Sequence, residues 1–338
     1  MLKKILGFLF KFILLPILLV FAIFYIWGSS SHSDKDYYTR IESYEYKKFY
    51  PNDTFSVMTY NIGFLSGMTN NLPVESEPDL YQSNLEKAIE LISTKSPDFV
   101  GFQEIDFDSK RSLGVNQLDK IGIGAAYPYG AVSVNWDKNY VPFPYWPPAI
   151  HYGKMLSGQA ILSKYSFVNN RRITLEKPKS APFYYNAFYL DRLIQIVQVD
   201  VGRPLILINV HLEAFDQETR ESQAEYLLEV VNDYTKNYPV ILMGDFNSRP
   251  PFATEQLNNE KTISLFLENP YLEVAVTKDR YLKNEQAYFT FSSGEPYEKL
   301  DYIFYTKKTL KLLSSDVIKE AGEISDHLPV MMEFTFVK

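Results

Sequence analysis

Several short apolar runs in this sequence are flanked by side chains that can bind cations or move protons. These side chains are carboxylates, amides and two histidines: Asn61, Glu104, His211, Asp245, Asn247, Asp326 and His327. A strand that ends in such a group places it at the rim of a sheet, where several ends can converge on one ion. Carboxylate and amide oxygens suit Mg²⁺ or Mn²⁺, and histidines transfer protons near neutral pH. The set supplies what phosphoester hydrolysis requires: charge neutralisation, an activated water and a protonated leaving group.

Each of these residues also has an ordinary structural interpretation. Asn61, with a glycine two residues later, fits turn chemistry, and Glu104 fits a solvated loop with other acids behind it. His211 fits a hydrogen-bonded histidine at a sheet edge. The segments around Asp245 and Asp326 fit a tight turn and a helix cap. No single residue decides the matter, so the catalytic hypothesis depends on the fold bringing the whole set together.

The elements that would position these residues are mostly strands. Short runs rich in β-branched and aromatic residues predict buried strands at Phe55–Tyr60, Phe99–Gln103, Gln159–Leu162, Leu193–Val199, Leu205–Val210, Val240–Met243, Tyr302–Tyr305 and Val330–Phe336. Many strands with few helices favour an α+β domain in which two sheets pack face to face and helices lie outside. No long linker or internal repeat interrupts the chain after about residue 50, so we expect one domain.

Helical spacing of apolar residues occurs in two places. Leu85, Ala88, Ile89 and Ile92 share one face of a segment that ends before Pro97, and a second face comprises Tyr226, Leu227, Val230 and Val231. The stretch from Tyr140 to His151 alternates prolines with aromatic residues, and it must be a loop because proline cannot donate to a central sheet ladder.

The composition limits the classes of protein to consider. The chain is 46% hydrophobic and 22% charged, which suits a sizeable folded core and not a disordered chain. Its net charge of −7 disfavours an extended nucleic-acid-binding surface. The absence of cysteine rules out disulfides, thiolate metal sites and a thiol nucleophile.

The N-terminal segment is predicted to be a membrane element. Between Ile5 and Trp27 the only charged residue is Lys11, and a helix of this length reaches across the roughly 30 Å of a bilayer core. Lysines before the segment and aromatic residues at its end predict a cytoplasmic start and an extracytoplasmic catalytic domain. A cleaved signal peptide is the alternative. We expect an anchor over residues 1–28, a tether over 29–50 and a catalytic domain over 51–338, with His32 solvated in the tether.

Six motifs then occur in a familiar order. They are Thr59-Tyr60-Asn61-Ile62, Gly101-Phe102-Gln103-Glu104, Asn209-Val210-His211-Leu212, Gly244-Asp245-Phe246-Asn247, Leu300-Asp301-Tyr302-Ile303 and Ser325-Asp326-His327-Leu328-Pro329. Together they closely resemble the endonuclease/exonuclease/phosphatase superfamily, and the resemblance runs from about residue 54 to 336. It implies a DNase I-like four-layer sandwich, two sheets flanked by helices, with the active site at one rim.

The resemblance also implies roles for individual residues. Glu104 and Asn61 are similar to the principal Mg²⁺ or Mn²⁺ site, with Asp326 at its edge. Asp245 and Asn247 resemble residues that place the scissile phosphate and the attacking water, with Asp245 also near the metal. His327, oriented by Asp301, looks like the histidine that activates water or stabilises the phosphorane.

His211 narrows the resemblance to one part of the superfamily. Histidine at this position resembles the deoxyribonuclease-like and neutral-sphingomyelinase-like branches, where it is tied to protonation of the leaving group. The run His211-Leu212-Glu213-Ala214-Phe215, with Arg220 and Gln223 after it, is most similar to the sphingomyelinase-like and lipid-remodelling relatives. Gln159, in a small-residue strand common to the superfamily, has mainly a structural role and is also a candidate for substrate contact.

The favoured substrate is a phosphodiester in a lipid headgroup or a small phosphorylated metabolite near a membrane. The apolar N-terminus, the acidic balance and the aromatic loop at 140–151 motivate this expectation, and His151 and Lys154 beside that loop are candidates for phosphate contact. An extracytoplasmic nuclease is the second hypothesis, kept open by basic residues near Arg171. A noncatalytic binding module is the third. We expect a monomer.

Overall fold

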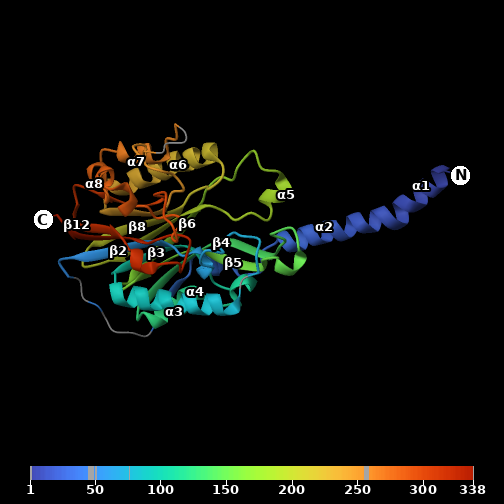
Figure 1. Ribbon diagram of the computed structural model, residues 1–338, viewed down its shortest axis with the longest axis horizontal. Helices are drawn as coiled ribbons and strands as arrows, with labels where there is room; N and C mark the ends of the chain where they lie inside the picture. The colour runs from blue at the N-terminus through green and yellow to red at the C-terminus, as the bar shows by residue number, and fades with distance from the viewer. Residues whose placement is uncertain (1, 45–48, 50–51, 76, 255–258, 338) are drawn as a thin grey trace.

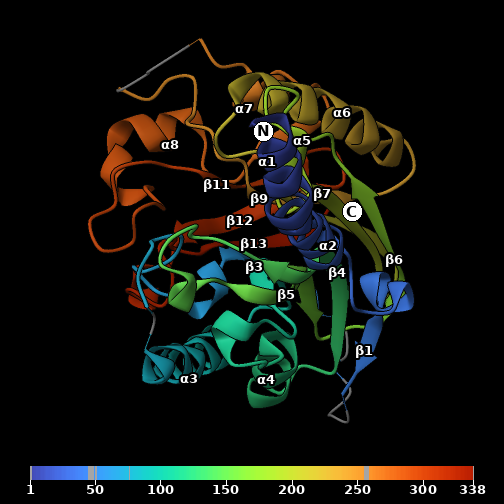
Figure 2. The ribbon, with the colours of Figure 1, turned by 90° about the vertical axis from the view of Figure 1, so that its right-hand side faces the viewer.

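Two mixed β-sheets lie face to face, and helices cover their outer faces (Figures 1 and 2). The computed structural model describes residues 2–44, 49, 52–75, 77–254 and 259–337. Among these residues the first sheet has seven strands in the order β1 (Ile41–Ser43), β4 (Tyr129–Val141), β5 (Gly153–Ser163), β3 (Phe99–Asp106), β2 (Phe55–Asn61), β13 (Val330–Phe336) and β12 (Leu310–Val317). The second has six, in the order β10 (Leu272–Val274), β11 (Asp301–Thr306), β9 (Val240–Asp245), β8 (Pro204–His211), β7 (Leu193–Asp200) and β6 (Phe167–Thr174).

Helices shield both sheets from solvent. The outer layers and connections comprise α3 (Pro78–Lys95), α4 (Gln117–Gly124), α5 (Phe183–Asn186), α6 (Gln217–Thr235), α7 (Thr262–Leu267) and α8 (Lys278–Lys283). The first two pack on the first sheet, whereas α6 and α7 pack on the second (Figure 2). Short 3-10 turns occur at Gly63–Leu65, Lys110–Ser112, Pro148–Ile150, Glu285–Ala287 and Lys319–Ala321. The predicted sandwich of two sheets flanked by helices is therefore confirmed.

The main core fills the space between the two sheets. Val57 and Phe102 of the first sheet and Leu207, Met243 and Ile303 of the second are all at most 1% exposed. Such strands are buried on both faces because the sheet and helix layers enclose them. This explains why the strands appear in the sequence as nearly continuous apolar runs and not as alternating patterns.

The structure adds strands that the apolar runs did not reveal. The longest is β4, and β6, β12 and the short edge strands β1 and β10 were also missed. In β4 the apolar residues Val132, Val134 and Trp136 alternate with polar ones, so the strand forms no continuous apolar run. The predicted loop at 140–151 begins two residues later than expected, because Tyr140 and Val141 complete this strand. In α6 the predicted apolar face includes Tyr226, which is in fact 45% exposed.

The N-terminal helix projects away from the domain (Figure 1). It consists of α1 (Leu2–Leu9), a π-helical turn (Phe10–Leu14) and α2 (Leu15–Ser29). Its span Lys3–Ser29 is 27 residues long and is apolar and exposed in its hydrophobic stretch. By length and composition it fits a membrane span, and a signal sequence passes the same criteria.

The segment after the helix does not behave as a free tether over the residues that the structure describes. A 3-10 helix (Lys35–Thr39) leads into β1, which pairs with β4. The backbone N–H of His32 donates to Asp137 Oδ1 at 2.9 Å, and the His32 ring lies 2.8 Å from the same oxygen. His32 is therefore partly buried and paired, contrary to the expectation that it is solvated, because the buried carboxylate of β4 needs partners. Residues 45–48 and 50 of the predicted tether lie outside the described chain.

Candidate active site

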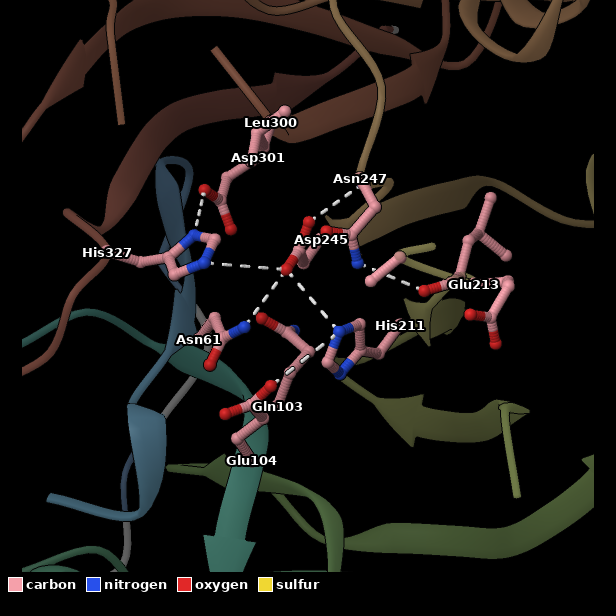
Figure 3. Close-up of polar contacts among 12 residues, drawn as sticks. Asn61, Gln103, Glu104, His211, Glu213, Asp245, Asn247, Leu300, Asp301 and His327 are labelled. Atoms are coloured by element: carbon pink, nitrogen blue, oxygen red, sulfur yellow. Dashed lines mark hydrogen bonds and ion pairs between the residues drawn. The ribbon is translucent and has the colours of Figure 1, made fainter. Parts of the chain in front are cut away.

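Strand register brings the polar side chains to one edge of the sandwich (Figure 3). Asn61 is paired with Gln103 at the ends of parallel strands β2 and β3, and His211 is paired with Asp245 at the ends of β8 and β9. Antiparallel β11 begins at Asp301, which is also paired with Asp245. Because parallel strands end at the same edge and an antiparallel neighbour begins there, residues far apart in sequence become neighbours.

Asp245 lies at the centre of this arrangement (Figure 3). Its Oδ2 accepts a hydrogen bond from Asn61 Nδ2 at 2.9 Å and lies 3.5 Å from His211 Nε2 and 3.7 Å from His327 Nε2. Its Oδ1 accepts from the backbone N–H of Asn247 at 2.8 Å. Burial raises the pKa of Asp245 to about 7. A carboxylate with such a pKa, between two histidines, suits proton transfer at neutral pH.

His327 is held by Asp301. The two side chains meet at 2.9 Å between Nδ1 and Oδ2, and this leaves Nε2 directed at Asp245. Burial opposes a charged imidazole, but the carboxylates of Asp301 and Asp245 together raise the pKa of His327 well above its ordinary value. The raised pKa favours the charged imidazolium, which fits the stabilising half of its predicted role better than the water-activating half.

Glu104 and Asp326 lie together on another side of the site. Asn70 Nδ2 donates to Glu104 Oε2 at 2.8 Å and lies 3.2 Å from Asp326 Oδ1, so one amide bridges the two carboxylates. Burial and the nearby Asp326 raise the pKa of Glu104. Glu104 also has a positive φ of 52°, an uncommon conformation for a non-glycine residue.

The donor set fits a divalent cation. Glu104 and Asp326 offer carboxylate oxygens of the hard type that Mg²⁺ and Mn²⁺ prefer, and their crowding in a buried place would be relieved by positive charge. A second group, Asp245, Asp301 and His327, also has ligand atoms within 4.8 Å of one another. In that group the Asp301 contact already occupies His327 Nδ1. Both groups offer oxygen ligands to a divalent cation, and the Glu104 and Asp326 side has two carboxylates bridged by one neutral amide.

His211 has a different electrostatic environment. It is 2% exposed, and burial, followed by the nearby Arg192, lowers its pKa well below the ordinary value. A neutral His211 does not protonate the leaving group as an imidazolium would. In the role that the resemblance implies, it would instead donate a hydrogen bond from Nε2–H to the leaving oxygen. Asn247 is fixed beside it, because its Nδ2 donates to the backbone carbonyl of Leu212 at 3.0 Å.

A cavity of about 540 Å³ opens onto these groups. The polar residues of its lining, here called the polar wall, include Glu104, Arg192, His211, Asp245, Asn247, Asp326 and His327. The aromatic residues of its lining, here called the aromatic wall, include Phe143, Tyr145, Tyr152, Tyr184, Tyr185, Phe188 and Phe215. A phosphate bound at the polar wall would therefore have a large apolar surface beside it.

Comparison with known sequences identifies the family to which this site belongs. The pattern of the Endonuclease/Exonuclease/phosphatase family matches residues 58–327, most of the chain. The chain belongs to this family. The resemblance drawn from six motifs is confirmed, and the site is that of a family whose members hydrolyse phosphoester bonds and generally use a divalent metal.

Individual relatives of the family are distant. The chain is 29% identical to a UPF0294 protein of Vibrio cholerae serotype O1 over 135 residues, 39% of this chain and 41% of the relative. It is 24% identical to human Nocturnin over 275 residues, 74% of this chain and 57% of Nocturnin. It thus spans less than two thirds of either relative. A crystal structure of an endonuclease/exonuclease/phosphatase from Beutenbergia cavernae aligns with TM-score 0.60 and 20% identity, covering 84% of this chain and 72% of the other, which supports the fold.

Three candidate substrate contacts, Gln159, His151 and Lys154, have other partners in the structure. Gln159 is fully buried between the sheets, where its Nε2 donates to the carbonyl of Asn209 at 2.8 Å. His151 is bonded to the hydroxyl of Tyr140 through Nδ1 at 2.9 Å, and Lys154 forms a close ion pair with Asp108. None of the three lines the cavity. Gln159 belongs to the buried amide network between the sheets. His151 is paired with Tyr140, and Lys154 is paired with Asp108.

Two residues that line the cavity, Asn70 and Arg192, lie outside the six motifs and were not predicted from the sequence. Asn70, in a loop, bridges Glu104 and Asp326. Arg192 is 4% exposed, and its Nε lies 3.5 Å from Glu213 Oε2, while its Nη1 has no hydrogen-bond partner among the described residues. The sequence signal for Arg192 was its position directly before β7, a strand of the second sheet.

Proposed function

We propose that this chain is a membrane-anchored, divalent-cation-dependent phosphodiesterase that acts on a phosphodiester carrying an apolar group, as in a membrane lipid. The observation that carries the proposal is a single cavity lined both by the polar wall and by the aromatic wall. A charged phosphate and an apolar substituent would each meet a matching surface there. The exposed apolar helix at the N-terminus supports a location at a membrane.

The side chains of the polar wall suit water attack on phosphorus. Asp245, between His211 and His327, is placed to accept the proton of a water as its oxygen bonds to phosphorus. The imidazolium of His327 stabilises charge on the phosphate oxygens, while Asn247 and His211 orient the ester. The bond from phosphorus to the leaving alcohol breaks, the alcohol oxygen takes up a proton from a solvent water, and Asp245 releases its proton to solvent. A cation held by Glu104 and Asp326 would supply charge neutralisation.

A nuclease is the second candidate, and the basic residues that motivated it are engaged elsewhere. Arg171 donates to the hydroxyl of Tyr234, while Arg172 and Lys177 both pair with Asp191. None of these three lines the cavity. A nucleic-acid substrate would therefore bring its backbone charges to an acidic protein in which two of these three cations are already paired with Asp191.

The test is a substrate comparison with the full chain in detergent micelles and Mg²⁺ or Mn²⁺. The substrates are sphingomyelin, phosphatidylcholine, bis(p-nitrophenyl) phosphate, inositol phosphates and plasmid DNA, and the matched inactive control is Asp245→Asn. We expect turnover of a lipid and of the synthetic diester that the control lacks. Turnover of DNA alone would establish the nuclease, and turnover of none of them would support the noncatalytic binding module.

A further inference from the structure

The most exposed large apolar side chains of the domain gather around the mouth of the cavity. Outside the N-terminal helix, the four highest exposures among large hydrophobic residues in the described ranges are those of Phe215 at 81%, Trp146 at 79%, Phe183 at 77% and Tyr145 at 67%. We call these four the aromatic rim. Tyr145 and Phe215 also line the cavity, so the rim continues into the aromatic wall.

The rim is continuous with the end of the apolar helix. The ring of Tyr25 in α2 lies 6.2 Å from that of Phe183 and 5.7 Å from that of Phe188, measured between centroids. Phe24 lies 5.7 Å from Tyr140 at the end of β4. Figure 1 shows the helix leaving the domain at the end where α5 and the ends of β4 and β5 lie. Phe188 therefore contacts the helix while it lines the cavity.

The positions of Phe24 and Tyr25 along α2 determine how deep in a membrane their contacts with the domain would lie. Phe24 and Tyr25 precede the helix end at Ser29 by four or five residues, which corresponds to roughly 6–8 Å of helix rise. If α2 crosses a membrane, this distance places the rings in the interfacial layer, where aromatic side chains are favoured. The aromatic rim would then meet the same layer of the same membrane.

We propose that the aromatic rim and the last turns of α2 form one bilayer-contacting surface, through which a phosphodiester lipid passes from the membrane into the cavity. The occupant is a lipid interface, because exposed aromatic side chains beside an apolar helix match its depth and polarity. The lipid phosphate reaches the polar wall, and its apolar part stays against Phe188 and Tyr145 on the side of the helix. This inference rests on the proposed function and adds the source and the route of the substrate.

The first test measures insertion with the full chain in vesicles of phosphatidylcholine and phosphatidylglycerol that carry brominated acyl chains. The chain has three tryptophans, and Trp136 is buried at 8% exposure. In a Trp27→Phe background we expect bromine to quench the fluorescence of Trp146. Adding Trp146→Phe leaves Trp136 as the reporter, and quenching should then be lost. Equal quenching in the two proteins, or none in either, would overturn the inference.

The second test separates membrane docking from chemistry. In Trp146→Ser/Phe183→Ser, which alters two rim residues that do not line the cavity, we expect turnover of vesicle lipid to fall by about tenfold. Turnover of bis(p-nitrophenyl) phosphate should stay within about twofold, because the polar wall is intact. The matched control is Tyr226→Ser/Tyr271→Ser, two exposed aromatics away from the cavity, and it should change neither rate.

The possible failures are distinguishable. If the wild type cleaves both substrates and the rim variant slows neither, the docking inference is wrong and the proposed function stands. If the wild type cleaves the soluble diester but no lipid, the lipid substrate and the docking inference both fail. If the rim variant converts a dimer into a monomer in light scattering, the rim is a contact between two copies of the chain, and the lipid interface is wrong.

Discussion

The two walls of the cavity are built in opposite ways. On the polar wall His211 and Asp245 are at most 2% exposed, and strand pairing places them. On the aromatic wall Tyr145 and Phe215 are 67% and 81% exposed, and they come from connections between elements. The polar wall has its geometry before any substrate arrives, whereas the aromatic wall presents surface that only a partner would bury.

This contrast indicates that the polar wall determines the reaction, whereas the aromatic wall determines which substrate is accepted. Preorganised charges at fixed positions lower the barrier of a reaction, and loops on a rigid scaffold change what the site accepts. Changes in the polar wall should therefore reduce turnover of every substrate to the same extent. Changes in the aromatic wall should reduce turnover according to how apolar the substrate is.

The largest effect is expected in the polar wall, from Asp245→Asn and from His327→Ala. Each removes a group that faces the reacting centre, so kcat should fall by about a thousandfold for soluble and lipid diesters alike. Thermal melts should change little for the asparagine variant, which preserves the shape of the side chain. Asp200→Asn, at an exposed strand end, is the matched control. Residual activity within tenfold of the wild type would remove these residues from the chemistry.

A smaller effect is expected where the polar wall would hold a cation. Removal of divalent ions should abolish turnover, and Mg²⁺ or Mn²⁺ should restore it. Asn70→Ala, which loosens Glu104 and Asp326 while keeping both, should raise the Mn²⁺ concentration for half-maximal activity by about 10–100-fold. Electron paramagnetic resonance of free Mn²⁺ measures the affinity directly. Unchanged activity in metal-free protein would contradict the assignment.

Arg192 is a cation of the polar wall, and Arg192→Met should raise KM for all diesters by about tenfold. It should also raise the pKa of His211, since burial and then Arg192 hold that pKa low. A histidine with a lowered folded-state pKa stabilises the fold above its ordinary value of 6.5, and this stability is lost as pH falls. NMR of labelled histidines should show the shift, and the variant should lose less stability in acid. An unmoved His211 resonance would contradict the coupling.

The sequence allowed the polar wall to be predicted because its residues follow or precede buried strands. The apolar runs ending at Asn61 and His211 were visible, and the order of motifs supplied the pairing that spacing alone could not. Gln159 was given mainly a structural role, with substrate contact as a second possibility, because an amide in a strand gives no sign of which face it occupies. In the fold it is buried in a network with Asn209.

The aromatic wall could be predicted only in part. The loop around Tyr145 was recognised from its prolines, but Tyr184 and Phe215 lie far away in sequence and join it only through the fold. Arg192 was missed because its partner Glu213 belongs to a different strand connection. Strand β4 was missed because its apolar residues alternate with polar ones and form no continuous run, and the bond of its Asp137 to His32 is not visible in the sequence. Such contacts depend on tertiary structure and leave no periodic pattern.

The smallest effect is expected from a single residue of the aromatic wall. Tyr145→Ala removes a ring that lines the cavity, so KM for a long-chain alkyl phosphodiester should rise by about threefold to tenfold with kcat unchanged. KM for a methyl phosphodiester should not change, since it has no apolar group to reach the ring. Tyr271→Ala, an exposed tyrosine away from the cavity, is the control. Equal losses for both substrates would mean that the aromatic wall does not select the substrate, and the division of labour between the walls would be wrong.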